Sequence, residues 1–366
     1  MEKLYIDKNL KIAVKFDKKI NELIDLDNSI LNNIYRARVN KILKNQKIAF
    51  LSLEDQDVFM NIRKIDEIHE NDEILVQVKK LAVEDKYAEL STELSLEGES
   101  IIYFINGPKD IKFSKKISNN SRENLKKFAR ENNFSSLLFR SNAIFAEEEE
   151  IIAEYEKFKE LEEHLKAQIN LRPTPKLLYK KNPLESFLKN YKEEIICNDM
   201  EIFKALKDGF NIKYDENFSL AYKKDFIEDY ASLFAKKIEL ENGGNIIIEE
   251  TFALTSIDVN ASNFQSNKNK EKFIFELNLA AANEIYRQVT LRNISGIIII
   301  DFVNMKSKTN KDKLLNHLRD KFKNDYTSSK VFGYTRLGLV EISRKSLGRQ
   351  LINKLNLYED NNADNK

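Results

Sequence analysis

The sequence predicts an α+β protein built from several domains. Three observations lead to this prediction: the chain has 366 residues, strand-like runs dominate up to about residue 96, and strands alternate with helices near the C-terminal end. A chain of this length is sufficient for two to four domains and a sizeable core. The sequence shows no internal repeat.

The first third of the chain is predicted to be rich in short strands. Residues 1–33 indicate strands that end in a loop, and Ile12–Phe16 is the clearest of them. Several β-like runs follow between Ile34 and about Leu96, separated by short polar turns. They are Tyr35–Val39, Ala49–Leu53, Val58–Met60 and Glu73–Val78. Short strands at this spacing predict a small closed barrel.

A second, small α/β unit is predicted to begin at Ile101–Ile105. We expect its helix at about 121–131 and a further strand at Leu137–Phe139. The acidic run Glu147–Glu150 then starts a long amphipathic helix that ends before Pro173. Because acidic residues favour a helix N-terminus, this run is expected to be a solvated helix start.

The C-terminal region alternates strands with helices. Two strands are followed by a helix at about 271–292, a strand, a helix at about 309–324 and the strand Leu337–Ile342. The first of these helices carries an apolar stripe that is expected to pack on a sheet. Its members are Ile274, Leu277, Ala281 and Ile285. The polar end, from Tyr358 to Lys366, is expected to be disordered.

Composition limits the classes of function. The 60 Lys and Arg nearly cancel the 59 Asp and Glu, so the net charge indicates no nucleic-acid partner and a polyanion site requires local clustering of cations. Cys197 is the only cysteine, which excludes a disulfide within the chain and a four-cysteine zinc module. No signal peptide or membrane span is evident, so a cytoplasmic protein is expected.

Two aspartates in apolar strands are the strongest candidates for chemistry. Asp258 lies within Phe252–Asn260, and Asp301 follows the run Gly296–Ile300. The isoleucine run predicts a strand buried on both faces, where an unpaired carboxylate costs several kcal/mol. Two carboxylates on neighbouring strands, with the Asn260 amide beside the first, are typical of a hard-cation site, in particular one for Mg²⁺.

Four segments of the chain, in order, resemble the ribonuclease E/G family. They are Asn33–Val39 with Ile48–Leu51, Gly243–Ile248 with Leu254–Asn260, Asn278–Gln288 running into Ile300–Phe302, and Thr335–Lys345. The first resembles the start of the family's S1 RNA-binding domain. The second and third resemble its two catalytic segments, and the fourth resembles the end of its catalytic domain. Four motifs in family order are far more specific than one S1 match.

The resemblance implies a particular order of domains. An RNase H-like subdomain would be interrupted by an S1 (OB-fold) β-barrel and a 5′-sensor domain, and a DNase I-like α/β catalytic subdomain would follow. The expected ranges are 1–33 with 183–233 for the RNase H-like subdomain, 34–97 for the barrel, 98–182 for the 5′-sensor domain, 234–351 for the catalytic subdomain and 352–366 for a polar tail.

The resemblance also assigns the catalytic residues. Asp258 and Asp301 would hold one Mg²⁺ per chain, for which Mn²⁺ could substitute, and Asn260 would hold the scissile phosphate or the attacking water. A magnesium ion lowers the pKa of its bound water and offsets charge on the phosphorane and the leaving oxygen, which explains these residue types. The alternative for both aspartates is a strand-end residue that caps the next turn or helix.

RNA contacts are implied on the barrel. Phe50 and Phe59 match family phenylalanines that contact RNA, and Lys86 matches a basic residue of the same groove. Base stacking contributes about 1–3 kcal/mol per base, although both rings could instead pack in the barrel core. Because the net charge is only +1, affinity is expected from a local channel. Its expected lining is Arg36, Lys86, Arg287, Arg292 and Lys345.

A grip on the RNA 5′ end is implied as well. Arg140 and Ser141 match a family Arg-Thr pair that would bind a terminal phosphate through a bidentate guanidinium and a hydroxyl, whereas the alternative is a solvated polar pair. Gly98 and Ile102 match positions of backbone contacts to that phosphate. Arg336 matches a residue of the catalytic domain close to the sensor. Cleavage should therefore be stimulated by a 5′-monophosphate.

The predicted function is a magnesium-dependent endoribonuclease that cuts single-stranded RNA and leaves a 5′-phosphate, in the processing or decay of ribosomal or messenger RNA. The alternative is a non-catalytic S1-type RNA-binding protein derived from this family. The retained Asp258, Asn260 and Asp301 favour the enzyme. An exonuclease or a DNA-directed hydrolase has no motif support.

Two departures from the family pattern concern assembly and a secondary contact. The family's Cys-Pro-x-Cys zinc link and small dimerisation domain are missing after Arg349, and Asn304 stands where an acidic residue is frequent. We therefore expect no zinc, and either a monomer or a dimer formed through another surface. His69, His164 and His317 lie outside the matched motifs and are expected to be surface or structural residues.

Overall fold

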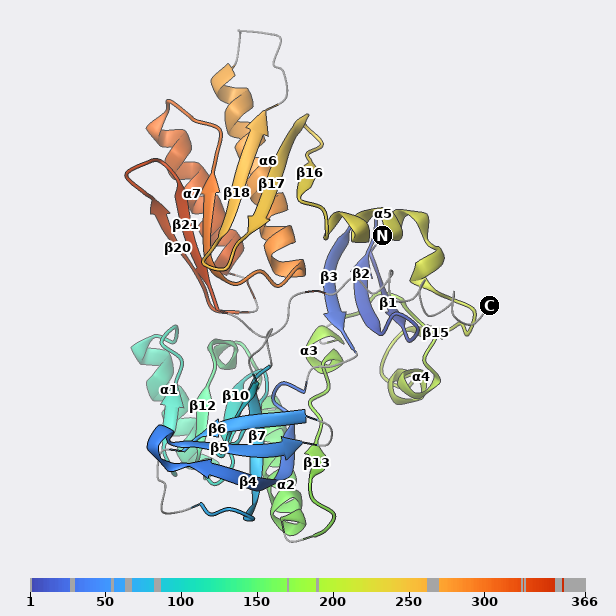
Figure 1. Cartoon of the computed structure of the whole chain (residues 1–366), viewed down its shortest axis with the longest axis vertical. Helices are drawn as coiled ribbons and strands as arrows, with labels where there is room; N and C mark the ends of the chain where they lie inside the picture. The colour runs from blue at the N-terminus through green and yellow to red at the C-terminus, as the bar shows by residue number, and fades with distance from the viewer. Residues whose placement is uncertain are drawn as a thin grey trace. The chain divides into compact units, whose positions relative to one another are not determined.

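The computed structural model describes residues 2–26, 30–53, 56–62, 68–81, 87–169, 171–188, 191–261, 270–323, 325, 327–345 and 351. The chain divides into two compact units. One consists of Met1–Asp27 together with Asn190–Lys366, and the other consists of Asn28–Lys189. The predicted polar tail at 352–366 lies outside the described residues. Figure 1 shows the helices and strands of both units.

The first unit contains a five-stranded sheet assembled from two distant parts of the chain. Its order is β15-β14-β1-β2-β3. The strands are β1 (Lys3–Asp7), β2 (Ile12–Phe16), β3 (Ile20–Asp25), β14 (Ile195–Cys197) and β15 (Ile212–Tyr214). β1 to β3 form an antiparallel meander, whereas β14 runs parallel to both β1 and β15. Helices α4 (Met200–Leu206) and α5 (Lys224–Ser232) follow, separated by a short 3-10 helix, Leu220–Tyr222.

A six-stranded mixed sheet forms the rest of this unit, in the order β16-β17-β18-β19-β21-β20. Its strands are β16 (Lys237–Glu239), β17 (Gly244–Glu250), β18 (Thr255–Ala261), β19 (Gly296–Asp301), β20 (Ser329–Tyr334) and β21 (Val340–Arg344). The helices α6 (Lys270–Leu291) and α7 (Lys308–Lys323) cover one face of it (Figure 1). The predicted apolar stripe of α6 is buried in the core beneath this face, which confirms that prediction.

The other face of this sheet is largely open, which corrects one expectation. In β19, Ile298 and Ile300 are fully buried, whereas Ile297 is 52% exposed. The prediction of a strand buried on both faces is therefore wrong. The isoleucine run gave no sign of this, because every residue in it is apolar whichever way it points. The consequence is that Asp258 and Asp301 are exposed to solvent rather than buried.

The second unit contains the predicted closed barrel. Its five strands are β4 (Ile34–Leu43), β5 (Ile48–Leu53), β6 (Gln56–Asn61), β7 (Glu73–Lys80) and β8 (Ala88–Ser91). They pair in the order β4-β5-β6-β8-β7, and the β4–β7 pairing closes the ring. A short 3-10 helix, Lys44–Gln46, joins β4 to β5, and β13 (Lys176–Tyr179) adds to the free part of β4. The alternating inward residues fill the barrel core.

A small four-stranded sheet completes the second unit, in the order β11-β12-β10-β9. The strands are β9 (Ser95–Glu97), β10 (Ile101–Phe104), β11 (Ile111–Phe113) and β12 (Leu137–Phe139). Its helices are α1 (Asn119–Glu131) and α2 (Glu148–Gln168), with a 3-10 helix at Ser141–Ile144 and a short α3 (Leu184–Leu188) further on. Aromatic side chains from α1, α2 and β10 share one core with the strands.

Most predicted elements are confirmed to within one or two residues at each end. There are two clear exceptions. The strand expected at Tyr35–Val39 extends to Leu43, and the last strand, expected at Leu337–Ile342, is observed at Val340–Arg344. Gly338 has a φ of +89° and belongs to the turn that joins β20 to β21, and Leu337 in the same turn is 87% exposed. The protein is thus a mixed α/β fold with a closed five-stranded barrel. The finer domain ranges and fold names stay predictions.

Candidate active site and RNA-binding surfaces

Asp258 and Asp301 are direct neighbours in the six-stranded sheet. β18 and β19 run parallel, and Asp258 stands opposite Asp301 in their register. Adjacent strands lie about 4.8 Å apart, so the two carboxylates leave the same face of the sheet side by side. The separation of 43 residues in sequence is spanned by α6, which crosses from the end of one strand to the start of the next.

Asn260 belongs to the same group of side chains. Residues two apart on a strand share a face, and the amide Nδ2 of Asn260 donates a hydrogen bond of 2.7 Å to Oδ2 of Asp258. Among the described residues Asp258 accepts this one side-chain hydrogen bond, and Asp301 accepts none that the structure shows. The alternative that these aspartates serve as caps for a turn or helix therefore has no support in the described contacts.

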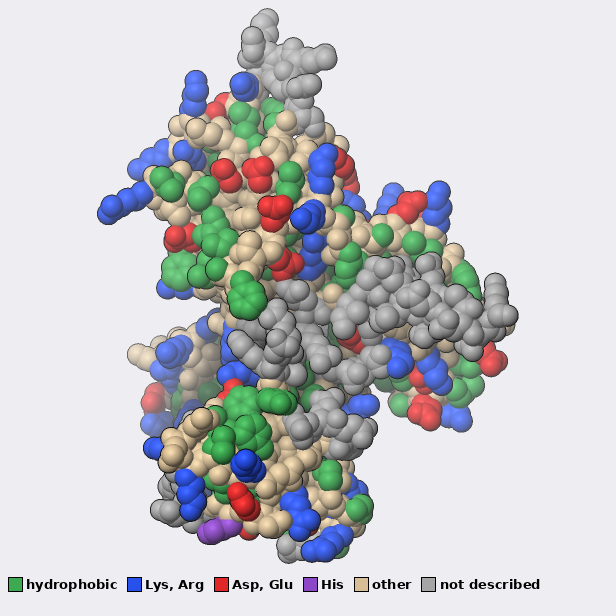
Figure 2. Space-filling view, in the orientation of Figure 1, with side chains coloured by type: hydrophobic (Ala, Val, Ile, Leu, Met, Phe, Trp, Pro, Cys, Tyr) green, Lys and Arg blue, Asp and Glu red, His purple; other side chains and the backbone are tan. Residues whose placement is uncertain are grey.

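The open face of this sheet is acidic. By the alternation along β17 and β21, Glu249 and Glu341 lie on the same face as the aspartate pair, and both are exposed. Figure 2 shows acidic side chains gathered on this face of the unit. An anionic phosphate would be repelled here unless a cation lay between it and the carboxylates. The charge of the surface therefore fits a site that works with a bound cation.

The donor set can be tested against the metal that was expected. Two carboxylates with an adjacent amide suit Mg²⁺, which keeps several of its waters and is usually held by one or two carboxylates. No group of three or more His, Cys, Asp and Glu within the described parts of the chain is placed to hold a metal ion.

The remaining candidate ligands lie elsewhere. Cys197 is buried in β14, and burial raises the pKa of its thiol to about 11. The His317 ring makes a 2.8 Å hydrogen bond with the Asn283 side chain, and burial lowers its pKa. His69 and His164 are exposed. These positions agree with the surface or structural roles expected of the histidines.

An aromatic cluster lies on the outside of the barrel. Phe50 on β5 and Phe59 on β6 are register partners, and both are half-buried while their neighbours along the strands fill the core. The alternative that these rings pack inside the barrel is therefore wrong. Tyr87, which is 53% exposed, meets Phe50 edge to face at 6.2 Å. Sequence reasoning missed Tyr87, although it directly follows Lys86, which lies outside the described residues.

Arg36 has a structural role, which corrects its assignment to the RNA surface. Its side chain is fully buried in the second unit. The Nε group donates to Thr174 Oγ1 at 2.9 Å, and the two other nitrogens donate to the carbonyl oxygens of Gln168 and Pro173. The guanidinium therefore anchors the segment that follows α2 against β4 and is closed off from a ligand.

Two further expected channel residues are also used by the fold. Arg287 pairs with Asp229 and Glu284, and all three side chains are at most 13% exposed. Arg292 donates to the carbonyl oxygens of Ser232 and Ala235, and burial lowers its pKa. Their assignment to the channel is therefore wrong. Lys345, by contrast, is exposed at the end of β21 and stays a candidate.

The predicted 5′-phosphate site contains a carboxylate of the protein itself. Glu154 on α2 accepts hydrogen bonds from three consecutive backbone N–H groups, at 2.5 Å from Glu99 and at 3.0 Å from both Ser100 and Ile101. A Cβ added at Gly98 would overlap this carboxylate, so glycine is needed for the close approach. The expected phosphate contact at Gly98 thus falls where Glu154 already lies.

Arg140 lies beside this arrangement, at the end of β12. It is exposed, and its Nη1 donates to the Gly98 carbonyl oxygen. Burial alone would raise the pKa of the nearby Glu97, but the charges of Lys181 and Arg140 outweigh it and lower that pKa. Ser141 is half-buried at the start of the following 3-10 helix. The Arg140 side chain is therefore exposed although one of its nitrogens is bonded, while the three backbone donors are occupied by Glu154.

The other two residues assigned to this phosphate have different surroundings. Ile102 is held within β10, where it pairs with Leu138 on one side and Glu97 on the other. Arg336 is exposed in the turn between β20 and β21, in the other unit. Both assignments stay predictions.

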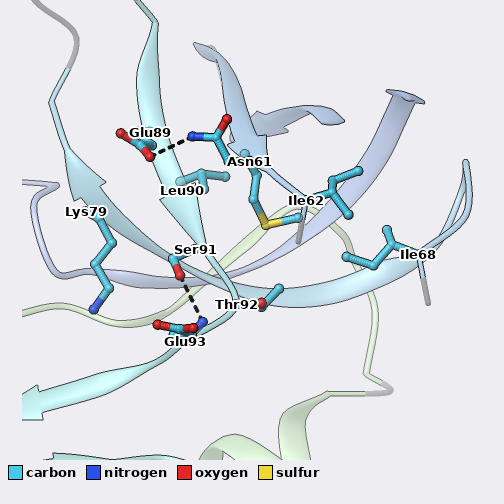
Figure 3. Close-up of a pocket in the computed structure, with 10 residues that line it drawn as sticks. Asn61, Ile62, Ile68, Lys79, Glu89, Leu90, Ser91, Thr92 and Glu93 are labelled. Carbon is cyan, nitrogen blue, oxygen red and sulfur yellow. Dashed lines mark hydrogen bonds between the residues drawn. The ribbon is translucent and has the colours of Figure 1, made fainter. Parts of the chain in front are cut away.

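A groove on the barrel, drawn in Figure 3, is a poor phosphate site. It is lined by Met60, Asn61, Ile62, Ile68, Lys79, Glu89, Leu90, Ser91, Thr92 and Glu93. Two carboxylates therefore face one lysine. Lys79 is itself engaged by Gln77 and Ser95, and burial lowers its pKa. The groove has neither the charge nor free cations for a polyanion.

Comparison with known proteins decides the family. The model of the Ribonuclease E/G family matches residues 95–347, which include both aspartates and the Arg140 region. The chain belongs to the ribonuclease E/G family. This confirms the resemblance found in the sequence motifs. The matched range contains three of the four motifs and every strand of the six-stranded sheet.

Individual members of the ribonuclease E/G family cover most of the chain. Ribonuclease G of Haemophilus influenzae is 28% identical over 86% of this chain and 72% of its own length. Ribonuclease G of Escherichia coli K12 is 26% identical, over 86% of this chain and 73% of its own length. Ribonuclease E of H. influenzae is 27% identical, over 87% of this chain but only 36% of its own length. No described helix is long and apolar enough to cross a bilayer.

Proposed function

We propose that this protein is a magnesium-dependent endoribonuclease that cuts single-stranded RNA and leaves a 5′-phosphate. The observation that carries the proposal is the register of Asp258 opposite Asp301, with Asn260 hydrogen-bonded to the first. Family membership and relatives named ribonuclease G and ribonuclease E support the same activity. The six-stranded sheet would be the DNase I-like catalytic subdomain, and the barrel would be the S1 domain.

Each residue of the site has a separate task in this reaction. Asp258 and Asp301 would hold the magnesium ion at the open edge of β18 and β19. When bound, this ion supplies a water of lowered pKa and offsets the charge that develops on phosphorus oxygens. Asn260 donates its amide N–H to the Asp258 carboxylate, and its carbonyl oxygen would orient the water or the scissile phosphate. The bond from phosphorus to the 3′-oxygen breaks as the water oxygen bonds to phosphorus.

Single-stranded RNA would be held by the barrel. Phe50, Phe59 and Tyr87 form a partly exposed aromatic surface on which successive bases can stack, in the manner of other single-strand binding barrels. Replacing Phe50 or Phe59 by Ala should weaken RNA binding by about 1–3 kcal/mol for each lost stack. Binding can be measured with the catalytically inactive Asp301→Asn variant, so that cleavage does not interfere.

A 5′-monophosphate would stimulate cleavage. Arg140 and Ser141 provide an exposed guanidinium and a hydroxyl next to each other, which suits a terminal phosphate. Terminal binding holds the strand and should lower the apparent KM more than it raises kcat. We expect 5′-monophosphorylated RNA to be cut faster than its 5′-hydroxyl counterpart, and Arg140→Ala to remove the difference. Equal rates on the two substrates in wild type would reject 5′ sensing and leave direct internal cleavage.

The decisive experiment uses an internally labelled single-stranded RNA with purified protein, magnesium and, in a parallel reaction, EDTA. We expect internal cuts with magnesium, none with EDTA, and none with Asp301→Asn. Mapping the new ends should give 5′-phosphates and 3′-hydroxyls. RNA binding without cleavage under all conditions would instead identify a non-catalytic RNA-binding protein derived from the family.

A further inference from the structure

A buried asparagine on α6 holds the chain at the point where it leaves β19. Asn278 is fully buried, and its amide bonds to both polar backbone groups of one residue, Val303. The Nδ2 group donates to the Val303 carbonyl oxygen at 2.8 Å, and the Val303 N–H donates to Oδ1 at 3.1 Å. Val303 lies two residues after Asp301, directly beyond the end of the strand.

A second contact fixes the far end of the same connection. Glu271, in the first turn of α6, accepts hydrogen bonds from the N–H groups of Lys306 at 3.2 Å and Ser307 at 2.9 Å. Phe302, just before the first contact, and Met305, between the two, are buried in the core under the sheet. The whole connection from Asp301 to α7 is therefore tied to α6 at both ends.

The geometry points to Asn278 as a positioning residue for the metal ligand Asp301. This inference rests on the proposed metal site. Asp301 is the last residue of its strand, so its backbone is held by the sheet on one side only and by the following connection on the other. A two-bond clamp on Val303 fixes the direction of the chain there, and with it the direction of the Asp301 carboxylate toward Asp258.

The residue type explains why this clamp is an asparagine. A primary amide carries its donor and its acceptor on two adjacent atoms without charge, so it can donate to the carbonyl oxygen and accept from the N–H of the same residue. A carboxylate could accept but not donate, and an ionised group at this fully buried position would be costly. Outer contacts that orient metal ligands typically change metal affinity or activity by 10- to 100-fold when they are lost.

The test compares Asn278→Ala with Gln288→Ala. Gln288 is a matched control because it is also a fully buried amide on α6, but its bonds go to Glu284 and Arg292. Binding of Mn²⁺ to the intact chain, measured by electron paramagnetic resonance without RNA, gives a Kd that does not depend on turnover. Thermal unfolding of each variant is measured in parallel.

We expect Asn278→Ala to weaken Mn²⁺ binding by about 10- to 100-fold and Gln288→Ala to leave the Kd within about twofold, although both lower the melting temperature. In RNA cleavage, Asn278→Ala should lower kcat with little change in KM. Asn278→Ser, which is neutral and leaves room for a water, carries the same expectation if the Ala variant does not fold.

A Kd for Asn278→Ala within twofold of wild type, with a lowered melting temperature, would show that the clamp serves stability alone and would overturn the inference. Asp301→Asn separates this result from failure of the metal site. If Asp301→Asn binds Mn²⁺ as wild type does, the proposed metal site is wrong and the inference falls with it. If Asp301→Asn loses binding and Asn278→Ala keeps it, only the inference is wrong.

Discussion

Carboxylates of this protein have two opposite kinds of surroundings. At the edge of β18 and β19, Asp258 and Asp301 are exposed, and the described contacts of the pair amount to one amide hydrogen bond. Between α2 and β10, the Glu154 carboxylate is surrounded by three backbone N–H groups. Asp325, which pairs with Arg344, is fully buried. The first arrangement leaves charge available to a ligand, whereas the others use the charge to hold the fold.

The difference separates function from stability. A satisfied carboxylate stabilises the folded state, and its loss should appear in unfolding experiments. An exposed carboxylate with few partners adds little to folding, so its loss should appear only in the reaction. We therefore predict that substitution of the exposed carboxylates will change the reaction, whereas substitution of the satisfied carboxylates will change the free energy of unfolding.

The largest effect is expected for Asp258→Asn. Loss of one of the two proposed metal ligands should reduce cleavage at least about 10³-fold, which corresponds to about 4 kcal/mol of transition-state stabilisation. The free energy of unfolding should change by no more than about 0.5 kcal/mol, because the side chain is exposed. Glu249→Gln, on the same acidic face, is the control and should keep full activity. A large loss of stability in Asp258→Asn would contradict the view that this exposed carboxylate adds little to folding.

Asp325→Ala should produce the opposite pattern. Arg344 Nε donates to Asp325 Oδ2 at 2.8 Å, and both side chains are fully buried. Removing the carboxylate takes the counter-charge from a buried guanidinium, which keeps its neutral partners Asn293 Oδ1 and the Ile294 carbonyl oxygen. Breaking a buried ion pair in this way typically costs about 3–5 kcal/mol. Chemical denaturation should show this loss, while kcat per folded molecule should stay near wild type. An apolar double substitution, Asp325→Leu with Arg344→Met, should recover part of the stability.

The sequence was sufficient to predict what depends on local pattern and on register. Short strand-like runs separated by polar turns located the barrel, and the two apolar strands around the α6 pattern predicted that Asp258 and Asp301 would lie on neighbouring strands. Phe50 and Phe59 became candidates through the family resemblance, and strand register makes them neighbours. The barrel and the aspartate pair follow from strand periodicity and from the rule that a helix connects parallel strands. Asn278 lay in a matched motif, but nothing in the motif indicated that its amide reaches Val303.

Contacts between side chains and distant segments of the chain could not be predicted from the sequence. Arg36 resembles any strand cation in sequence, and its burial is decided by Thr174, which lies 138 positions further along. Arg287 is likewise buried by Asp229, 58 positions before it. The Glu154 carboxylate reaches a turn that lies 53 to 55 positions before it. Long polar side chains have the same local signal whether they meet solvent or a partner, so the fold alone decides between the two.

Glu154→Gln tests whether the Glu154 carboxylate on α2 stabilises the fold. An amide can accept from the turn through one oxygen only, and its own N–H₂ opposes the remaining donor groups, so we expect a loss of about 1–3 kcal/mol in unfolding free energy. Glu149→Gln, exposed in the first turn of the same helix, is the control and should change stability by less than about 0.5 kcal/mol. Unchanged stability in Glu154→Gln would mean that this carboxylate is available to respond to a ligand.

The smallest effect is expected at Lys345. Of the cations proposed for the RNA channel, it is the one that is exposed within the described part of the chain. Its side chain is exposed at the end of β21, whereas Arg36, Arg287 and Arg292 are used within the fold. If Lys345 contacts one phosphate, Lys345→Ala should weaken binding to single-stranded RNA of any sequence. The slope of log K against log salt should then fall by about 0.7 to 1, because one fewer counterion is released.

Lys224→Ala removes the same charge from an exposed position on α5 and serves as the control, with an unchanged slope. The measurement is a fluorescence anisotropy titration at several salt concentrations with the inactive Asp301→Asn protein. An equal reduction in both variants would assign the effect to net charge, and binding that does not depend on salt would reject phosphate contacts as the source of affinity.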